Sequence, residues 1–224
     1  MAWMLDWLFP PRCPFCRRFL PKGEGPVCRD CLEHLPHCRE RAEKHKPTFV
    51  DGVVCALVYE GAVRRAMHRY KFGGRLAYGK TFAGLLARRV EESGVASRVQ
   101  AVCWVPCHRA TRRERGYDQA EELARQTAAR LGLPAAPSLK KERHTPPMYQ
   151  LDAAQRRANV RSAFAAGPEE LHGLSVLLVD DIFTTGATFS ECARVLREQG
   201  ASHVYGAALA QTPRRPERNK QRTS

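Results

Sequence analysis

The sequence predicts an α/β fold, an open parallel sheet flanked by helices, preceded by a small cysteine-rich module. Three observations lead to this prediction. Short apolar runs recur along the chain, amphipathic stretches with helical spacing lie between them, and two C-x-x-C pairs stand near the N-terminus. Continuous apolar runs suit strands covered by helices on both faces, and strands that alternate with helices imply parallel βαβ units.

The expected strands are four short apolar runs, at Val53–Val58, Ala101–Val105, Val176–Asp180 and Val204–Ala210. The clearest helix is expected over Asp118–Leu131, because Asp118 and Glu121 can cap its start and Gly132 can end it. A second helix is expected over Thr188–Gln199, with Gly200 after its end.

Composition divides the chain into three zones. Residues 1–46 are rich in Cys, Pro and His, residues 47–210 alternate apolar and amphipathic stretches, and residues 211–224 are polar and basic. We therefore predict a zinc-binding module, an α/β domain and a disordered tail. The tail is interpreted as a solvated end, with a nucleic-acid-binding arm as the alternative.

The charge balance is strongly basic. The chain has 224 residues, and Lys plus Arg number 37 against 23 Asp plus Glu, which gives a formal net charge of +14. Such a surface attracts polyanions, including nucleic acid and phosphorylated metabolites, although solubility alone is an equal explanation.

No apolar stretch approaches the roughly 20 residues that a membrane-spanning helix needs. Residues 1–10 carry Asp6 and no basic segment, so they do not have the form of a signal peptide. We therefore expect a cytoplasmic protein, whose nine cysteines are free thiols or metal ligands rather than disulfides.

The two C-x-x-C pairs predict a structural zinc site. Cys13 and Cys16 form the first pair and Cys28 and Cys31 the second, with eleven residues between the pairs. Each pair can offer two sulfurs to one ion, and together they complete a tetrahedral four-cysteine site. A redox pair is the alternative, as is replacement of one ligand by His34, His37 or Cys38. Cys55, Cys103 and Cys192 lie inside apolar runs and are expected to be core thiols.

The segment VLLVDDIFTTGAT is the most informative for function. A buried strand leads into Asp180 and Asp181, then a Thr- and Gly-rich loop, then a helix. Ligands bind beyond the carboxyl ends of strands in open α/β sheets, and a helix N-terminus with free N–H groups favours a phosphate. The carboxylates suit sugar hydroxyls beside that phosphate. The segment therefore predicts a site for a ribose 5-phosphate, with a capped, ligand-free helix as the alternative.

This segment resembles the signature of type I phosphoribosyltransferases, which bind phosphoribosyl pyrophosphate (PRPP). The order of the other motifs resembles the ComF (ComFC) competence family. Those motifs are the four-cysteine module, Tyr70-Lys71-Phe72, Val105-Pro106, Arg115-Gly116-Tyr117-Asp118-Gln119-Ala120 and Arg156-Arg157-x-Asn159-Val160. Three departures stand out. Asp118 replaces the usual Asn and adds negative charge near the expected phosphate site, and Met148 replaces a usual Gln. Many members carry a second C-x-x-C module after the first, of which only Cys38 remains here.

The resemblance implies a role for each matching residue. Asp180 and Asp181 would bind the ribose hydroxyls, and the segment Thr184, Thr185, Gly186, Ala187 and Thr188 would bind the 5-phosphate. The stretch Val105–Arg109, which includes Pro106, would bind pyrophosphate. A basic mobile loop over Arg112–Gln119 would close over the site. Further charge would come from Lys71, Arg109, Arg112, Arg113 and Arg115, for which a solvated surface is the alternative. Mg²⁺ would bridge pyrophosphate and ribose oxygens.

Three functions are compatible with these residues. The first is a ComF-like role in uptake of single-stranded DNA during transformation, with competence-machinery proteins such as a helicase or DNA-processing factor as partners. The second is a nucleobase or amine phosphoribosyltransferase. The third is a non-catalytic, PRPP-sensing adaptor. The competence role comes from the resemblance alone.

Overall fold

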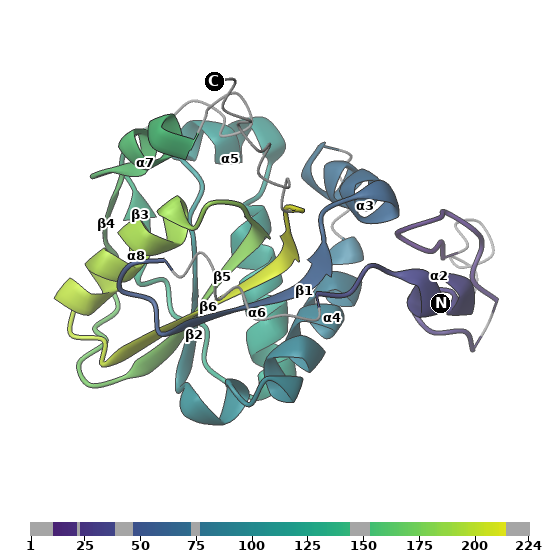
Figure 1. The fold of residues 1–224 in the computed structure, drawn as a ribbon, viewed down its shortest axis with the longest axis horizontal. Helices are drawn as coiled ribbons and strands as arrows, with labels where there is room; N and C mark the ends of the chain where they lie inside the picture. Colours follow the sequence, from purple (N-terminus) through teal and green to yellow (C-terminus); the bar gives the residue numbers. More distant parts are fainter. Residues whose placement is uncertain (1–10, 22, 39–46, 73–76, 144–152, 214–224) are drawn as a thin grey trace, which may run out of the picture.

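The computed structural model describes residues 11–21, 23–38, 47–72, 77–143 and 153–213. A four-stranded parallel sheet forms the centre, in the order β1-β6-β5-β2 (Figure 1). Its strands are β1 (Gly52–Val58), β2 (Ala101–Trp104), β5 (Ser175–Phe183) and β6 (His203–Gln211). The central strand β5 pairs with both β6 and β2, so its carboxyl end lies in the middle of the sheet edge where ligands bind in such folds.

Helices cover both faces of this sheet. On one face, α4 (Tyr78–Glu92) and α6 (Gln119–Leu131) pack against each other and against the strands, and α3 (Gly61–Phe72) joins the same core through Val63, Ala66 and Met67. The other face carries α8 (Ala187–Glu198), which contacts α7 (Ala153–Val160) and an antiparallel ribbon of β3 (Leu139–Lys141) and β4 (Phe164–Ala166). The apolar strands are thus buried on both sides, which explains their unbroken apolar sequences.

The predicted fold class is confirmed, and the four predicted strands are present with small shifts of their ends. The largest shift concerns β5, which runs on to Phe183 because its pairing with β6 continues through Asp180, Ile182 and Phe183. Helix α6 has the predicted caps at Asp118 and Gly132. Helix α8 begins at Ala187 rather than Thr188, with Gly186 in the N-cap position.

The N-terminal module packs on the same core as the sheet. Helix α2 (Arg29–His34) lies in the part of the chain that projects at one end of the molecule, beside α3 and α4 (Figure 1). Phe15, Leu20 and Val27 are buried and belong to the cluster that also contains Leu177 and Val179 of β5. A bridge from His37 to Leu57 ties the module to β1. The predicted boundaries at residues 46 and 210 stay predictions.

Three further predictions concern the core cysteines, membrane-spanning helices and segments outside the described residues. Cys55, Cys103 and Cys192 are buried free thiols, as expected of core residues. In the described part of the chain, no helix has both the length and the apolar character needed to cross a membrane. Residues 1–10, the tail from residue 214 and Met148 lie outside the described residues.

Candidate functional site

The two adjacent carboxylates lie at the carboxyl end of β5, in its last residues rather than after it. Asp180 is opposite Ala208 of β6, and the strand continues to Phe183 before the loop Thr184–Gly186 leads into α8. Successive side chains of a strand point to opposite faces of the sheet. The acidic pair is therefore divided between the two faces, and the two carboxyl groups have different neighbours.

Asp181 faces the side of α3. It is 9% exposed, and its Oδ2 lies 2.6 Å from the Nζ of Lys71, the penultimate residue of α3. Both side chains are largely shielded from water, at 12% and 21% exposure, so the attraction is stronger than that of a surface pair. The structure thus brings together Asp181 and Lys71, two predicted site residues that are 110 positions apart.

Asp180 faces the side of α8 and the β3–β4 ribbon, where it lies within electrostatic reach of Lys141 and Cys192. Burial raises the pKa of Asp180 to about 8, with a further upward contribution from the neighbouring Asp181 carboxylate, while Lys71 opposes the rise. Its Oδ1 accepts a hydrogen bond from the backbone N–H of Asp181 at 2.8 Å. Around neutral pH this carboxyl group is therefore largely protonated, whereas Asp181 carries an ion pair.

The loop after β5 has the properties of an anion cradle. Gly186 has φ +79°, and a Cβ at this position would come within 2.9 Å of Pro47, so glycine is required both for conformation and for space. The hydroxyl oxygen of Thr185 is buried without a hydrogen-bond partner among the described residues. No side chain caps the start of α8, where Ala187 and Thr188 form the first turn. A buried unpaired hydroxyl and an uncapped helix start together favour a bound anion.

The segment expected to be a mobile loop, Arg112–Gln119, has a different structure. Residues Arg109–Arg115 form helix α5, which ends at Gly116 with φ +81°. Asp118 then fixes the turn, because its Oδ1 accepts from the N–H groups of Ala120 and Glu121 and its Oδ2 accepts from Cys107 at 2.6 Å. Three backbone donors thus surround the carboxylate that was expected to add negative charge to a phosphate site. Asp118 joins the end of β2 to the start of α6.

Tyr117 and Gln119, which follow α5, hold the end of α3. The hydroxyl of Tyr117 donates to the carbonyl oxygen of Tyr70, and the side-chain amide of Gln119 donates to that of Lys71 at 3.4 Å. In return, the hydroxyl of Tyr70 donates to the carbonyl oxygen of Gln119 at 3.1 Å. The sequence analysis named Tyr117 and Gln119 only as parts of motifs. It missed their contacts with the end of α3, because no local pattern reveals a contact across 47 positions.

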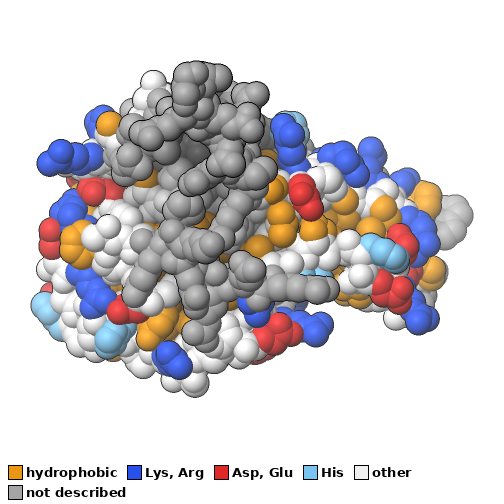
Figure 2. Space-filling view, in the orientation of Figure 1, with side chains coloured by type: hydrophobic (Ala, Val, Ile, Leu, Met, Phe, Trp, Pro, Cys, Tyr) orange, Lys and Arg blue, Asp and Glu red, His pale blue; other side chains and the backbone are white. Residues whose placement is uncertain are grey.

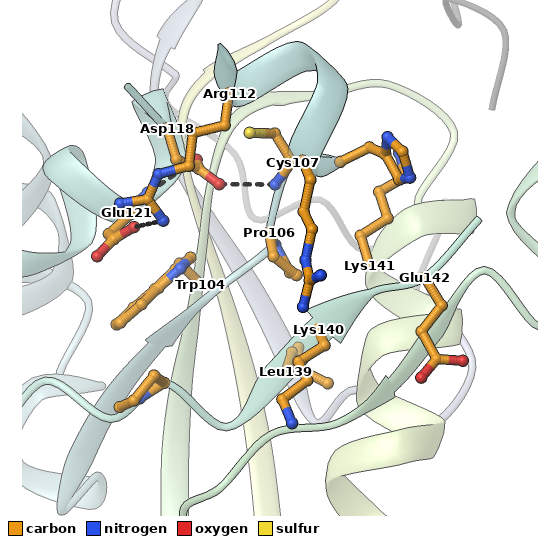
Figure 3. Close-up of a pocket in the computed structure, with 13 residues that line it drawn as sticks. Trp104, Pro106, Cys107, Arg112, Asp118, Glu121, Leu139, Lys140, Lys141 and Glu142 are labelled. Atoms are coloured by element: carbon orange, nitrogen blue, oxygen red, sulfur yellow. Dashed lines mark hydrogen bonds and ion pairs between the residues drawn. The ribbon is translucent and has the colours of Figure 1, made fainter. Parts of the chain in front are cut away.

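A pocket of about 590 Å³ lies at the carboxyl end of β2, between the residues that follow this strand and β3 (Figure 3). Its lining includes three predicted site residues, Pro106, Arg109 and Arg112, but neither aspartate of β5. Arg112 pairs with Glu121 at 3.2 Å, and the figure shows this pair beside the contact between Asp118 and Cys107. Lys141, a lining residue that sequence reasoning missed, has its pKa lowered by burial.

The remaining predicted cations also lie on α5. Arg115 donates to the side-chain oxygen of Gln119 at 2.9 Å, and Arg113 is an exposed residue of the same helix. The arginines therefore border the loop after β2, whereas Lys71 alone of the predicted cations contacts the acidic pair. Two groups of predicted site residues result, one around the end of β5 and one around the end of β2.

The four cysteines of the N-terminal module form a metal-ligand cluster. The Sγ atoms of Cys13, Cys16, Cys28 and Cys31 all lie within 4.8 Å of one another, and those of Cys16 and Cys28 are 3.6 Å apart. Tetrahedral zinc with Zn–S bonds of about 2.3 Å requires sulfurs about 3.8 Å apart, so the donor set and spacing fit Zn²⁺. Within the described ranges, no other group of three His, Cys, Asp or Glu side chains is arranged to hold a metal.

Comparison with known proteins identifies the class. The phosphoribosyl transferase domain family matches residues 118–223, and the double zinc ribbon domain family matches residues 4–57. The first match contains β5, both aspartates and the anion cradle, and the second contains the four cysteines. The chain is a phosphoribosyltransferase-fold protein with an N-terminal zinc-binding module.

Three curated proteins are similar to this chain. The chain is 28% identical to competence protein F of Haemophilus influenzae, over 89% of this chain and 96% of that protein. It is 25% identical to competence protein ComFC of Bacillus subtilis, over 84% and 72% of the two chains. It is also 25% identical to DNA utilization protein YhgH of Escherichia coli K12, over 91% and 98%. The chain is similar to these three proteins over most of its length.

Parts of two enzymes of known structure also match part of this chain. Glutamine phosphoribosylpyrophosphate amidotransferase of B. subtilis matches 60% of this chain and 26% of its own, with 27% identity and a TM-score of 0.38. An adenine phosphoribosyltransferase matches 66% and 75%, with 15% identity and a TM-score of 0.40.

Proposed function

We propose that this protein binds PRPP at the carboxyl end of β5 and acts, like the relatives named for competence and DNA utilization, in handling DNA taken up by the cell. The observation on which the proposal rests is the anion cradle directly after Asp180 and Asp181. A ribose 5-phosphate needs donors for its phosphate and acceptors for its hydroxyls. The Thr184–Thr188 segment offers the first, and the two carboxyl groups offer the second.

Each group has a defined task in this proposal. The hydroxyl of Thr185 and the first N–H groups of α8 bind the 5-phosphate. Asp181 accepts hydrogen bonds from ribose hydroxyls once the ammonium of Lys71 moves toward the ligand's negative charge. Arg109 and Arg112, at the end of β2, neutralise pyrophosphate. All the side chains with a task in this proposal are ones that the sequence predicted for the site.

Mg²⁺ enters this scheme with the ligand. Asp181 is already paired with Lys71, and Asp180 carries a proton around neutral pH, so the chain offers few free oxygens. Such a site suits Mg²⁺, which keeps several waters and is held mainly by substrate phosphates. When bound, it supplies charge neutralisation for the pyrophosphate.

Calorimetric titration of the zinc-loaded protein with PRPP, with and without Mg²⁺, tests the proposal. We expect binding in the micromolar range that weakens at least tenfold without Mg²⁺, on the order of 1.4 kcal/mol. The absence of binding at millimolar PRPP would contradict it. Turnover with a panel of nucleobases and amines then distinguishes a transferase from a PRPP-sensing adaptor.

Single-stranded DNA is the proposed polyanionic partner. Lys and Arg side chains recur across the visible face of the described residues (Figure 2). With the net charge of +14, this surface favours phosphate contacts. We expect binding of oligonucleotides to fall steeply between 50 and 200 mM salt, by about 10³-fold if six phosphates are contacted. Binding independent of salt would contradict the proposal. A helicase or DNA-processing partner and a cytoplasmic location stay predictions.

A further inference from the structure

One side chain joins the four-cysteine module to the end of α3. The guanidinium Nη2 of Arg69 donates to the carbonyl oxygens of Pro14 at 2.6 Å and of Phe15 at 3.3 Å. Pro14 and Phe15 are the two residues between the ligand cysteines Cys13 and Cys16. Metal coordination fixes the shape of such a knuckle turn, so it also fixes where these two carbonyl oxygens point.

Aromatic packing makes a second connection along the same line. Phe15 is 2% exposed and its ring centroid lies 5.9 Å from that of Phe82 on α4. Phe82 in turn packs edge-on against Tyr70 at 5.4 Å, and Tyr70 lies 6.1 Å from Tyr117. The knuckle therefore contacts the residue before Tyr70 through hydrogen bonds and Tyr70 itself through a row of rings.

The next residue is Lys71, the cation paired with Asp181. Its backbone belongs to the last turn of α3, which is held from the other side by Tyr117 and Gln119. The position of the Lys71 ammonium thus depends on two supports, the turn after α5 and the zinc knuckle. A shift of the knuckle changes one of the two supports.

We propose that Arg69 is a positioning residue that couples zinc loading of the four-cysteine module to ligand binding at the Lys71–Asp181 pair. The coupled ligand is a phosphorylated ribose, so the proposal rests on the proposed function. With zinc bound, Arg69 holds the last turn of α3 so that Lys71 reaches Asp181. Because coupling between two sites is reciprocal, a ligand at Asp181 also stabilises the zinc-bound module by the same factor.

The wild-type protein provides the first test. The extent of zinc release to a competing colorimetric chelator is measured at equilibrium, with and without saturating PRPP and Mg²⁺. We expect PRPP to reduce zinc release by an amount that corresponds to about tenfold tighter zinc binding, within the usual range of coupling between sites. An unchanged zinc affinity in a protein that binds PRPP would overturn the proposal.

Variants separate Arg69 from the rest of the helix. Arg69→Met removes both hydrogen bonds, and Arg69→Lys keeps one donor. The matched control is Arg65→Met, because Arg65 is an exposed arginine one turn earlier on α3. We expect Arg69→Met to retain one zinc ion, to bind PRPP about tenfold more weakly and to lose the effect of PRPP on zinc release. Arg69→Lys should recover part of both effects, and Arg65→Met should behave as wild type. PRPP affinity of wild-type strength in zinc-loaded Arg69→Met would overturn the proposal.

A wild-type protein that does not bind PRPP would contradict only the proposed function. In that case, hydrogen exchange still tests the coupling between the zinc knuckle and α3. Amides in the last turn of α3 should exchange faster after zinc removal from the wild-type and Arg65→Met proteins. In Arg69→Met they should exchange fast with zinc present and change little on its removal. Exchange of this turn that does not respond to zinc in the wild-type protein would overturn the coupling.

Discussion

Asp180 and Asp181 are neighbours in the sequence and the same residue type, yet the fold treats them differently. Asp181 points toward α3, where Lys71 lies 2.6 Å away. Asp180 points toward α8 and the β3–β4 ribbon, where burial raises its pKa to about 8. At the same end of one strand, one carboxyl group is thus held in an ion pair and the other has a raised pKa.

The cause is the two-residue period of the strand, which sends adjacent side chains into two environments. On the Asp181 side, hydrogen bonds join α3 to the turn after α5 and to the zinc knuckle, and an ion pair joins α3 to Asp181. On the Asp180 side, the cluster is largely apolar and includes Leu178, Phe189 and Cys192. Charge state at this site follows from what packs on each face rather than from the acidic motif itself.

The largest expected effect concerns ligand affinity. Asp181→Asn removes the charged partner of Lys71 and should weaken PRPP binding at least about 100-fold. Asp180→Asn replaces a group that is already largely neutral at pH 7, so it should weaken binding only about tenfold. Titration calorimetry of both variants at pH 7 checks the contrast. Equal losses would show that the two carboxyl groups are equivalent in the complex.

The second prediction concerns stability against pH. In the folded protein Asp180 holds its proton up to about pH 8, whereas in the unfolded chain it loses it near pH 4, so stability falls as pH rises through this window. Relative to Asp180→Asn, the wild-type protein should lose on the order of 4 kcal/mol between pH 5 and pH 9, which corresponds to about three pKa units. Urea unfolding of both proteins at the two pH values measures the difference. The zinc ligands are common to both, so parallel profiles would contradict the assignment.

A third prediction tests the close packing on the Asp180 side. A Cβ added to Gly206 of β6 would come within 2.7 Å of the ring of Phe189 and 3.2 Å of Val53. Gly206→Ala should therefore destabilise the protein by about 1–2 kcal/mol through overpacking. Gly84→Ala is the matched control, because its Cβ would meet only Arg130 side-chain atoms at 3.4 Å or more. The denaturant midpoint of Gly206→Ala should be lower than that of Gly84→Ala.

The smallest effect is expected at Asp118, which joins the ends of β2 and α6. Asp118→Asn restores the residue that is usual in the ComF family. The NH₂ group of the new side chain would oppose another donor, either the backbone N–H of Cys107 or those of Ala120 and Glu121. We expect a loss of about 1 kcal/mol in unfolding free energy and little change in PRPP affinity. A rise in affinity would instead support the original view that Asp118 places unfavourable charge near a phosphate.

Local patterns were sufficient for much of this protein. The spacing of Cys13, Cys16, Cys28 and Cys31 predicted the metal cluster, because a knuckle turn needs only four consecutive residues to present two sulfurs. Apolar runs predicted the four strands, and Asp118 and Gly132 predicted the ends of α6. The loop after β5 was predicted for the same reason, because adjacent residues encode the strand, the glycine turn and the start of the helix.

Other features depended on contacts between distant segments. The family resemblance implied a mobile loop over Arg112–Gln119, but this segment contains the end of a helix and a turn fixed by three hydrogen bonds to Asp118. The roles of Arg69, Tyr117 and Gln119 follow from partners about 50 positions away, and their residue types give no sign of them.

By itself, the sequence predicted the four strands of the sheet, the two helices α6 and α8 and the cluster of four cysteines. Each of these depends on interactions within a few residues, where spacing fixes geometry. That the loop after β5 binds an anion stays a prediction. Only the tertiary structure decided that Asp181 is paired with Lys71, that Asp180 is largely neutral, and that the zinc knuckle supports α3. Those properties arise from burial and from the juxtaposition of faces, which exist only after the sheet and its two helical layers have packed.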